Sequence, residues 1–256
     1  MSESAPPVTD KLVPRFPRIV VRGTDAYFGT VVRLIDVIAG TKTGGAVLNN
    51  ITEGAIRIEP EPDAEACDPE SGSLVDHHRC KVMAAAAVIK FSPHFAKRAS
   101  RRSGLCREIW MEGDEVLLHE LVHAMRSARK VQDCRELGRG LTGFDSREEF
   151  FAVLIENIYR SERRLGKAFK GKLDAQVPLR RNHGLGRMFA GEAQAFNKDL
   201  LKLELVLTLW NEPTMEAMCR EIAAVETAFN PLRWARAKGP LQALRSPAEA
   251  AVFIQR

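Results

Sequence analysis

The 256-residue chain has no apolar run of the roughly 20 residues that a membrane-spanning helix needs. Its first ten residues lack the basic start and apolar core of a cleaved signal peptide. Its five cysteines are an odd number and no two have C-x-x-C spacing, so the sequence predicts neither a disulfide framework nor a cysteine-ligated zinc site. We therefore expect reduced thiols, no membrane partner and no general secretion with signal cleavage.

Tyrosine and tryptophan are scarce, with two and three residues, so the aromatic stacking surfaces of many nucleic-acid-binding proteins are not evident. The formal net charge is nevertheless +5, and basic residues gather at 97–102, 160–172 and 180–181. Such runs usually lie on solvated faces, and the first could equally attract an acidic protein substrate. No DNA- or RNA-binding motif accompanies them, so a basic nucleic-acid-binding protein is kept only as an alternative.

The organisation of the chain is that of one globular domain. Residues 1–18 are polar and interrupted by prolines, which predicts a flexible N-terminal tail. Residues 19–256 are then expected to form a single domain, mixed in secondary structure to about residue 130 and mainly helical after it. The fold class predicted from this order is α+β.

Periodicity of apolar residues predicts the elements of the first half. They are a helix over 27–38, a glycine-rich turn at 40–45, a short helix near 46–52, and strands at 55–59 and 84–92. The second strand is ended by Pro93 and is expected at a sheet edge, where an extended peptide can pair with it. Between the strands, the loop-like stretch 60–80 contains His77 and His78, whose side chains point in different directions and are expected at the surface.

The most informative segment is His119-Glu-Leu-Val-His123, which lies within a helix predicted over 114–126. Residues four apart share one face of a helix, so the two imidazoles can bind a single metal ion. Glu120 is about 100° further round and would face a water on that ion. Imidazole suits zinc, and three protein ligands would leave one position open for reaction. The surrounding apolar residues indicate a buried helix, in which histidines need partners.

A third ligand is predicted from a second helix over 144–159. Asp145 and Ser146 both fit its first position, and each has a glutamate three residues later, at Glu148 and Glu149 respectively. If Asp145 caps the helix together with Glu148, Glu149 is left to point inward among apolar neighbours. A metal ion would remove the cost of burying that carboxylate. We therefore predict that Glu149 completes a zinc site with the two histidines.

These motifs resemble those of known zinc peptidases. Glu149-Phe-Phe-Ala is similar to the ligand helix of gluzincins, and the block 115–162 resembles the NleD-type effector metallopeptidases, which bacteria inject into host cells to cut signalling kinases. The resemblance extends over about 27–185. It implies a zincin-like fold with a small mixed sheet, an active-site helix and a largely helical C-terminal half.

The resemblance also implies a function. The chain would be a zinc-dependent endopeptidase with Glu120 as general base, acting on a protein such as a host signalling kinase after injection without a cleaved signal peptide. The alternatives are a catalytically silent zinc-containing binding domain and, for location, the bacterial cytoplasm.

Two parts of such a site are left open by the sequence. Many gluzincins carry an acidic residue four positions after the ligand glutamate to orient a histidine, and here that position is Val153. Glu156 and Asn157 are alternative partners, although Glu156 lies about 10 Å along the helix from the ligand, too far to share the metal. For the oxyanion of the reaction, which zincins commonly stabilise with an added donor, the candidates are Tyr159 and His183. Arg180 is a weaker third candidate.

Overall fold

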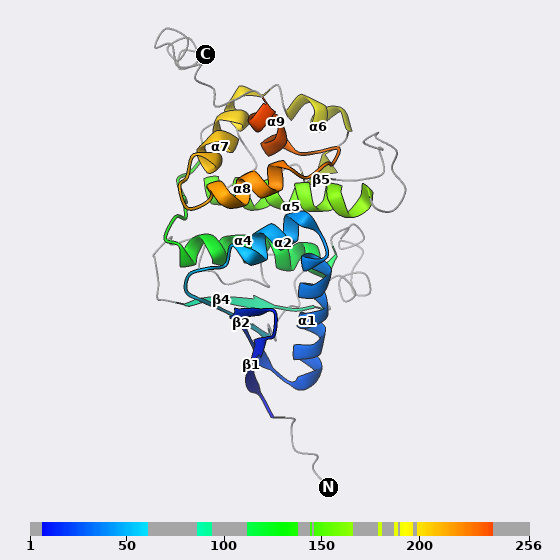
Figure 1. The fold of residues 1–256 in the computed structure, drawn as a ribbon, viewed down its shortest axis with the longest axis vertical. Coiled ribbons are helices and arrows are strands. Elements are labelled where there is room, and N and C mark those ends of the chain that lie inside the picture. Colours follow the sequence, from blue (N-terminus) through cyan, green and yellow to red (C-terminus); the bar gives the residue numbers. More distant parts are fainter. Residues whose placement is uncertain are drawn as a thin grey trace.

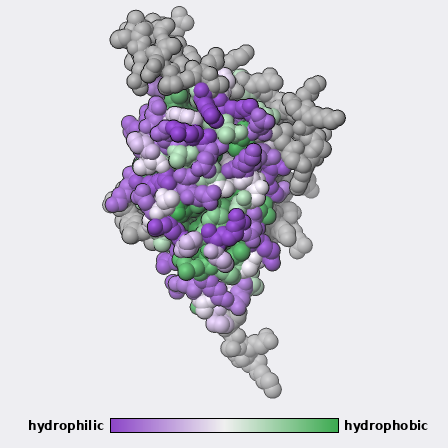
Figure 2. Space-filling model, in the orientation of Figure 1, coloured by the Kyte–Doolittle hydropathy of each residue, from purple (hydrophilic) through white to green (hydrophobic). Residues whose placement is uncertain are grey.

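The computed structural model describes residues 7–60, 86–93, 112–137, 144, 146–165, 179–180, 187–188, 190–196 and 199–237. Figure 1 shows a small sheet near one end of the molecule and helices stacked from there towards the other end. The architecture is α+β, as expected. Figure 2 shows the same face mostly covered by hydrophilic residues, with apolar residues in separate groups between them. In the described part of the chain, no helix is long and apolar enough to cross a membrane.

The main sheet has four strands in the order β1-β2-β3-β4. They are β1 (Thr9–Val13), β2 (Phe16–Gly23), β3 (Ala55–Pro60) and β4 (Ala86–Phe91). β1 is antiparallel to β2, whereas β3 is parallel to both β2 and β4. This confirms a small mixed sheet and the strands predicted at 55–59 and 84–92. Within the described residues β4 is an edge strand, also as predicted.

The flexible tail predicted over 1–18 is wrong from Thr9 onwards, where β1 and then β2 form. Ile19, just after this segment, is fully buried in the core. This burial holds the segment in place, whereas a disordered tail buries no side chain. The prolines are compatible with the sheet. Pro14 lies in the turn, and Pro17 falls where the register between the two strands shifts, so its missing N–H removes no regular ladder bond.

Helix α1 (Asp25–Ala39) confirms the helix predicted over 27–38, and Gly40 ends it. Helix α2 (Lys42–Asn49) begins inside the stretch predicted as a turn, so that prediction is wrong beyond Thr41. Thr41 caps α2, because its hydroxyl accepts the Gly44 amide hydrogen at 2.9 Å. A side chain at Gly44 would clash with the carbonyl oxygen of Ile38, so glycine here permits close packing of α1 and α2 rather than a turn.

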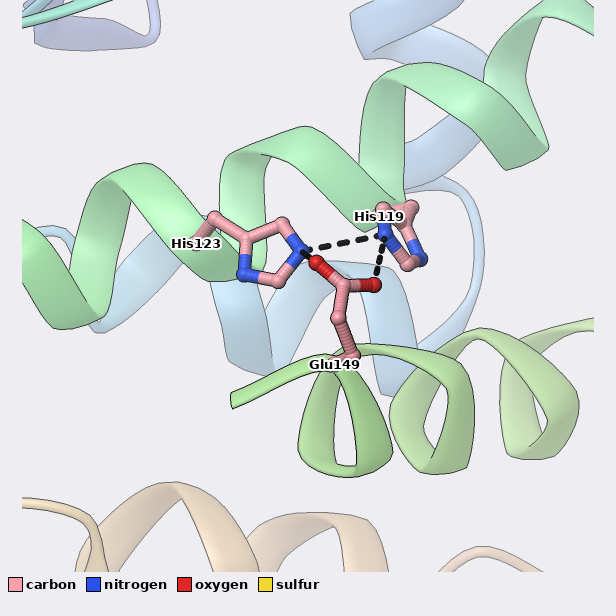
Figure 3. A group of neighbouring side chains, drawn as sticks. All are labelled: His119, His123 and Glu149. Carbon is pink, nitrogen blue, oxygen red and sulfur yellow. Dashed lines mark hydrogen bonds and ion pairs between the residues drawn. The ribbon is translucent and has the colours of Figure 1, made fainter. Parts of the chain in front are cut away.

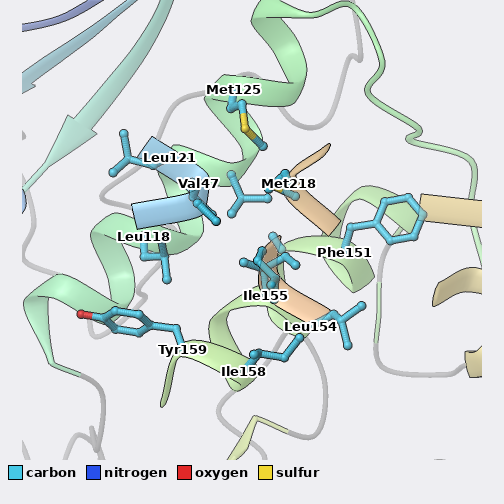
Figure 4. Packing of buried hydrophobic residues seen from close by; sticks show 14 of the residues in the cluster. Val47, Leu118, Leu121, Met125, Phe151, Leu154, Ile155, Ile158, Tyr159 and Met218 are labelled. Carbon is cyan, nitrogen blue, oxygen red and sulfur yellow. The ribbon is translucent and has the colours of Figure 1, made fainter. Parts of the chain in front are cut away.

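Helices α4 (Gly113–Ala128) and α5 (Arg147–Leu165) occupy the middle of the molecule and confirm the two predicted motif helices. In Figure 1, α4 lies between the sheet and α5, and it contacts β3 and β4. Figure 4 shows the core that these helices share with α2 and with α8 (Glu216–Ala223), including Val47, Leu118, Leu121, Ile155 and Met218. Because α4 is enclosed on several sides, its polar groups must find partners within the protein.

The rest of the described chain is mainly helical, which confirms the prediction for the C-terminal half. Besides α8 it contains α6 (Ala190–Phe196), α7 (Leu200–Trp210) and α9 (Pro231–Ala237). A short antiparallel pair is formed by β5 (Leu179–Arg180) and β6 (Arg187–Met188). β5 contacts α5, and this contact brings Arg180 to the two motif helices.

Candidate metal centre

Helix α4 carries the histidines on a fully enclosed segment. Its first turn is fixed by a capping box in which the side chains of Glu112 and Glu115 bond each other's backbone N–H groups. Every residue from Asp114 to Arg126 is buried, including both histidines of the motif. His123 has no exposed surface, whereas His119 keeps an exposed fraction of 6%. The accessible side of the site is therefore the His119 side.

Helix α5 begins in a different register from the one predicted. The hydroxyl of Ser146 accepts the backbone N–H of Glu149 at 3.2 Å, so Ser146 caps the helix. Asp145, the predicted cap, lies outside the described residues. The prediction that Glu148 is a capping residue is wrong, because its side chain is buried and turned towards α4. Glu149 points inward as predicted.

The side chains of His119, His123 and Glu149 converge between α4 and α5 (Figure 3). The two Nε2 atoms lie 3.0 Å apart. One carboxylate oxygen of Glu149 lies 3.4 Å from Nε2 of His119, and the other lies 3.2 Å from Nε2 of His123. An ion bound tetrahedrally at the usual zinc distances would separate its donor atoms by about 3.3 Å. The group can therefore hold a metal ion, as the sequence predicts.

The other nitrogen of each imidazole faces a glutamate of α5. Nδ1 of His119 lies 3.2 Å from Oε2 of Glu156, and Nδ1 of His123 lies 3.3 Å from Oε1 of Glu148. When each Nδ1 donates its hydrogen to a carboxylate, both Nε2 lone pairs are directed into the space between the rings. Two such lone pairs 3.0 Å apart repel unless a proton or a cation lies between them. The neighbouring carboxylates thus select the imidazole form that binds metals.

The predicted partners of the histidines are only partly confirmed. Glu156 contacts His119, as one of the two alternatives proposed. Asn157 does not, because its amide group exchanges hydrogen bonds of 2.8 Å and 2.7 Å with the backbone of Arg180. Glu148 was missed as a partner of His123. A signal was present in the pair of adjacent glutamates, but the capping pattern suggested a local role instead.

Each of these two glutamates is paired with a buried arginine. Nε of Arg126 donates to Glu148 at 2.8 Å, and Nη1 of Arg180 donates to Glu156 at 2.8 Å. Burial disfavours ionisation of Glu156, but Arg180, His119 and Arg160 together outweigh burial and lower the pKa of that carboxyl to about 2. Burial likewise opposes ionisation of Glu148, yet Arg126 and His123 together hold its pKa below the usual value. Both carboxylates are therefore charged hydrogen-bond acceptors.

Buried charge in this region is negative on balance. In the described part of the chain the buried carboxylates are those of Asp114, Glu115, Glu120, Glu148, Glu149 and Glu156. The guanidiniums among them are those of Arg126, Arg160 and Arg180, all buried, and of Arg163, which pairs with Asp114. Six carboxylates against four guanidiniums leave an excess of two negative charges. A divalent cation would offset this excess, as would protons on the two imidazoles.

The pKa shifts of the metal-free site follow from this charge. Burial disfavours the charged imidazole of His123, but Glu149 and Glu148 together outweigh burial and raise its pKa to about 10. The pKa of His119 is raised as well, since Glu149 and Glu156 outweigh burial there. Burial opposes ionisation of Glu149, yet the two imidazoles hold its pKa far below the usual range. Without a metal, the site therefore holds protons where a cation would bind.

Glu120 lies beside this group without belonging to it. It follows His119 directly on α4, is buried with an exposed fraction of 4%, and is not one of the three converging donors. Its charge is close enough to contribute to the raised pKa of His123. This is the position expected of a carboxylate that acts next to a metal rather than on it.

The predicted oxyanion donors are not supported. Tyr159 is fully buried, and its hydroxyl donates to Asp114 at 2.5 Å, a contact that favours a structural role, so its catalytic role stays a prediction. Arg180 lies 3.4 Å from Nδ1 of His119, on the side of the ring that faces away from the converging donors, and so it is not placed to hold an oxyanion. His183 lies outside the described residues.

Of the two cysteines in the described residues, one departs from the expected reduced thiol and one agrees with it. Cys134, in the connection between α4 and α5, is disulfide-bonded, so the prediction of a reduced thiol is wrong there. Cys219 on α8 is a free thiol and fully buried. The odd number of cysteines and their irregular spacing gave no sign of the bond.

No family model matches the chain, and no curated protein or solved structure matches it. The function of the centre is therefore inferred from its own residues.

Proposed function

We propose that the protein is a zinc metallopeptidase. The observation that supports this most is the convergence of His119, His123 and Glu149 at separations that suit one tetrahedral ion, with Glu120 next to it on the same helix. Three protein donors leave a fourth position for a reacting group, which is typical of catalytic rather than structural zinc sites. The zincin-like character of the fold is part of the same proposal.

Zinc is the metal that the donor set favours. The two imidazole nitrogens are borderline ligands that suit zinc, and zinc also accepts a carboxylate oxygen, whereas calcium and magnesium prefer oxygen donors alone. The excess of two buried negative charges in the described region also matches a divalent ion. Each imidazole is held by a carboxylate at Nδ1, an arrangement that recurs around protein zinc sites.

The proposed reaction is hydrolysis of a peptide bond. Zinc, when bound, supplies a Lewis acid that polarises the scissile carbonyl and makes a water molecule more acidic. Glu120 accepts a proton from the water that attacks the carbonyl carbon. It then delivers that proton to the amine nitrogen as the carbon–nitrogen bond breaks. Burial of the Glu120 side chain keeps bulk water away and strengthens its interaction with the reacting groups.

A protein substrate is proposed for two reasons. β4 is an edge strand within the described sheet and contacts α4, so an extended chain could add to the sheet next to the helix that carries the histidines. The resemblance of the motif block to NleD-type effectors also favours a protein target, and it is the sole support for a host signalling kinase as substrate and for delivery by injection.

The test is Glu120→Gln, which keeps the size of the side chain but cannot accept the proton. Zinc content and melting temperature should stay near those of the wild type, while cleavage of a quenched fluorescent peptide library should fall by about 10²–10⁴-fold. Glu204→Gln, at an exposed position on α7, is the control for loss of one negative charge. A variant that retained most of its activity would exclude Glu120 as the base. A wild type that binds zinc and cleaves nothing would favour the silent binding domain.

A further inference from the structure

The position that orients a histidine in many gluzincins is occupied here by Val153, which is buried and has no hydrogen-bonding side chain. The imidazoles nevertheless need to be fixed, because a ring that rotates about its side-chain bonds loses its metal-binding geometry. Both rings make their Nδ1 contacts with glutamates of α5 outside that position.

On the His123 side, Glu148 is held by two groups other than the ring, a guanidinium and a backbone N–H. Arg126, one turn beyond His123 on α4, donates to both carboxylate oxygens, at 3.0 Å and 2.8 Å. The backbone N–H of Asp133 donates to Oε2 at 3.1 Å. Oε1 of Glu148 also faces Nδ1 of His123. The Glu148 carboxylate is therefore fixed by α4 and by the connection between α4 and α5. It can face the His123 ring in one orientation.

On the His119 side, Glu156 is held in a similar way by residues from two elements. Arg180 of β5 donates to Oε2, the oxygen that also faces Nδ1 of His119, and Arg160 donates to Oε1 at 3.3 Å. The backbone of Arg180 is itself held by Asn157, one residue after Glu156 on α5. A residue 61 positions after His119 in the chain thus takes part in fixing the ring.

We infer that Glu148 and Glu156 are positioning residues for the metal centre, and that each is oriented by its own buried arginine, Arg126 for Glu148 and Arg180 for Glu156. The inference rests on the proposed metal centre. Each glutamate takes the Nδ1 hydrogen of one imidazole, and this leaves Nε2 of that ring as the metal-binding atom. The two pairs replace the single acidic residue that the gluzincin pattern would place at Val153.

The test measures zinc binding and metal geometry instead of turnover. Glu148→Gln and Glu156→Gln should each weaken zinc affinity by about 10–100-fold, measured by competition with a chromophoric chelator. The visible absorption of the cobalt-substituted protein should also change in both variants, because a rotated imidazole alters the ligand field. Glu162→Gln is the matched control: Glu162 is also on α5, but its carboxylate accepts the backbone N–H groups of Lys42 and Thr43 at the start of α2. It should leave both measurements unchanged.

Loss of stability is separated from loss of positioning by a further variant. If Glu148→Gln fails to fold because Arg126 keeps its charge, the double substitution Arg126→Gln with Glu148→Gln removes both charges and should fold, yet still bind zinc weakly. Unchanged affinity and an unchanged cobalt spectrum in the folded variants would overturn the inference while the three ligands stand. A wild type that binds no zinc would instead overturn the proposed function.

Discussion

Glu148 and Glu149 are adjacent in the chain, yet their side chains contact opposite edges of the same imidazole. Oε1 of Glu148 lies 3.3 Å from Nδ1 of His123, and Oε1 of Glu149 lies 3.2 Å from its Nε2. The first carboxylate is neutralised by Arg126, whereas the second faces the space between the two histidines. The two glutamates therefore differ in role: Glu148 pairs with a buried arginine, whereas Glu149 faces the proposed metal position. Experiments can separate these two roles.

Substitution of the two glutamates by alanine should give opposite patterns. In the presence of a chelator, Glu148→Ala should lower the free energy of unfolding by about 3–5 kcal/mol, because it leaves the Arg126 guanidinium buried without its carboxylate. Glu149→Ala should cost less than Glu148→Ala in the same conditions, since the imidazoles can release their protons and an arginine cannot. Urea denaturation measures both values.

With zinc present, the Glu149→Ala variant should be the one that loses most affinity, because a ligand is removed. If Glu148→Ala abolished zinc binding while Glu149→Ala retained it, Glu148 and not Glu149 would be the third ligand.

Removal of either histidine should remove the metal. His119→Ala and His123→Ala should contain less than stoichiometric zinc after dialysis, measured by elemental analysis, because two donors do not hold the ion tightly. Wild-type protein at a free zinc concentration of 100 times its Kd should gain about 2.7 kcal/mol of stability, which the variants should lack. His78→Ala, in the segment predicted at the surface, is the control and should behave like the wild type. Tight stoichiometric zinc in either motif variant would contradict the ligand set.

Tyr159→Phe distinguishes a structural hydroxyl from a catalytic one. The hydroxyl donates to Asp114, which also pairs with Arg163, so its loss should lower the free energy of unfolding by about 1 kcal/mol. Zinc affinity and peptide cleavage should stay within about twofold of the wild type. Tyr27→Phe is the control, because that hydroxyl also donates within the fold, to the carbonyl of Phe91 at 2.9 Å. A large loss of turnover in Tyr159→Phe alone would show that the Tyr159 hydroxyl takes part in the reaction.

The sequence predicts the metal ligands because helix geometry brings them together. His119 and His123 share one face of α4 through their spacing alone, and the apolar surroundings of Glu149 indicate that it points into the core. The partners of these ligands are not predictable in the same way. Two adjacent glutamates fit the same capping pattern, and the choice between them is made by Arg126 on another helix.

Contacts between residues far apart in the sequence are even harder to predict from it. Arg180 reaches Glu156 only because β5 packs against α5, and no local pattern marks it for that role. The N-terminal strands were missed for a related reason. Proline and polar residues near Pro14 and Pro17 suggest disorder, while burial of Ile19 against the rest of the sheet outweighs that tendency.

Cys219 should make stability depend on pH in the alkaline range. Its thiol is fully buried on α8, and burial raises its pKa from 9.0 to about 12. Between these values the unfolded chain gives up the thiol proton while the folded chain keeps it. The stability that the neutral thiol contributes is therefore fully present below pH 9 and is lost as the pH rises towards 12. At pH 10 the loss should be about 1.4 kcal/mol relative to pH 8.

Cys219→Ala lacks this ionisation, so the difference in unfolding free energy between wild type and variant should shrink by that amount from pH 8 to pH 10. Chemical denaturation at both pH values measures it, and the comparison cancels the contribution of other groups that titrate in this range. A difference that stays constant with pH would show that the thiolate is tolerated in the folded protein. In that case Cys219 would be accessible to water or stabilised by a cation, contrary to its burial among the helices of the C-terminal half.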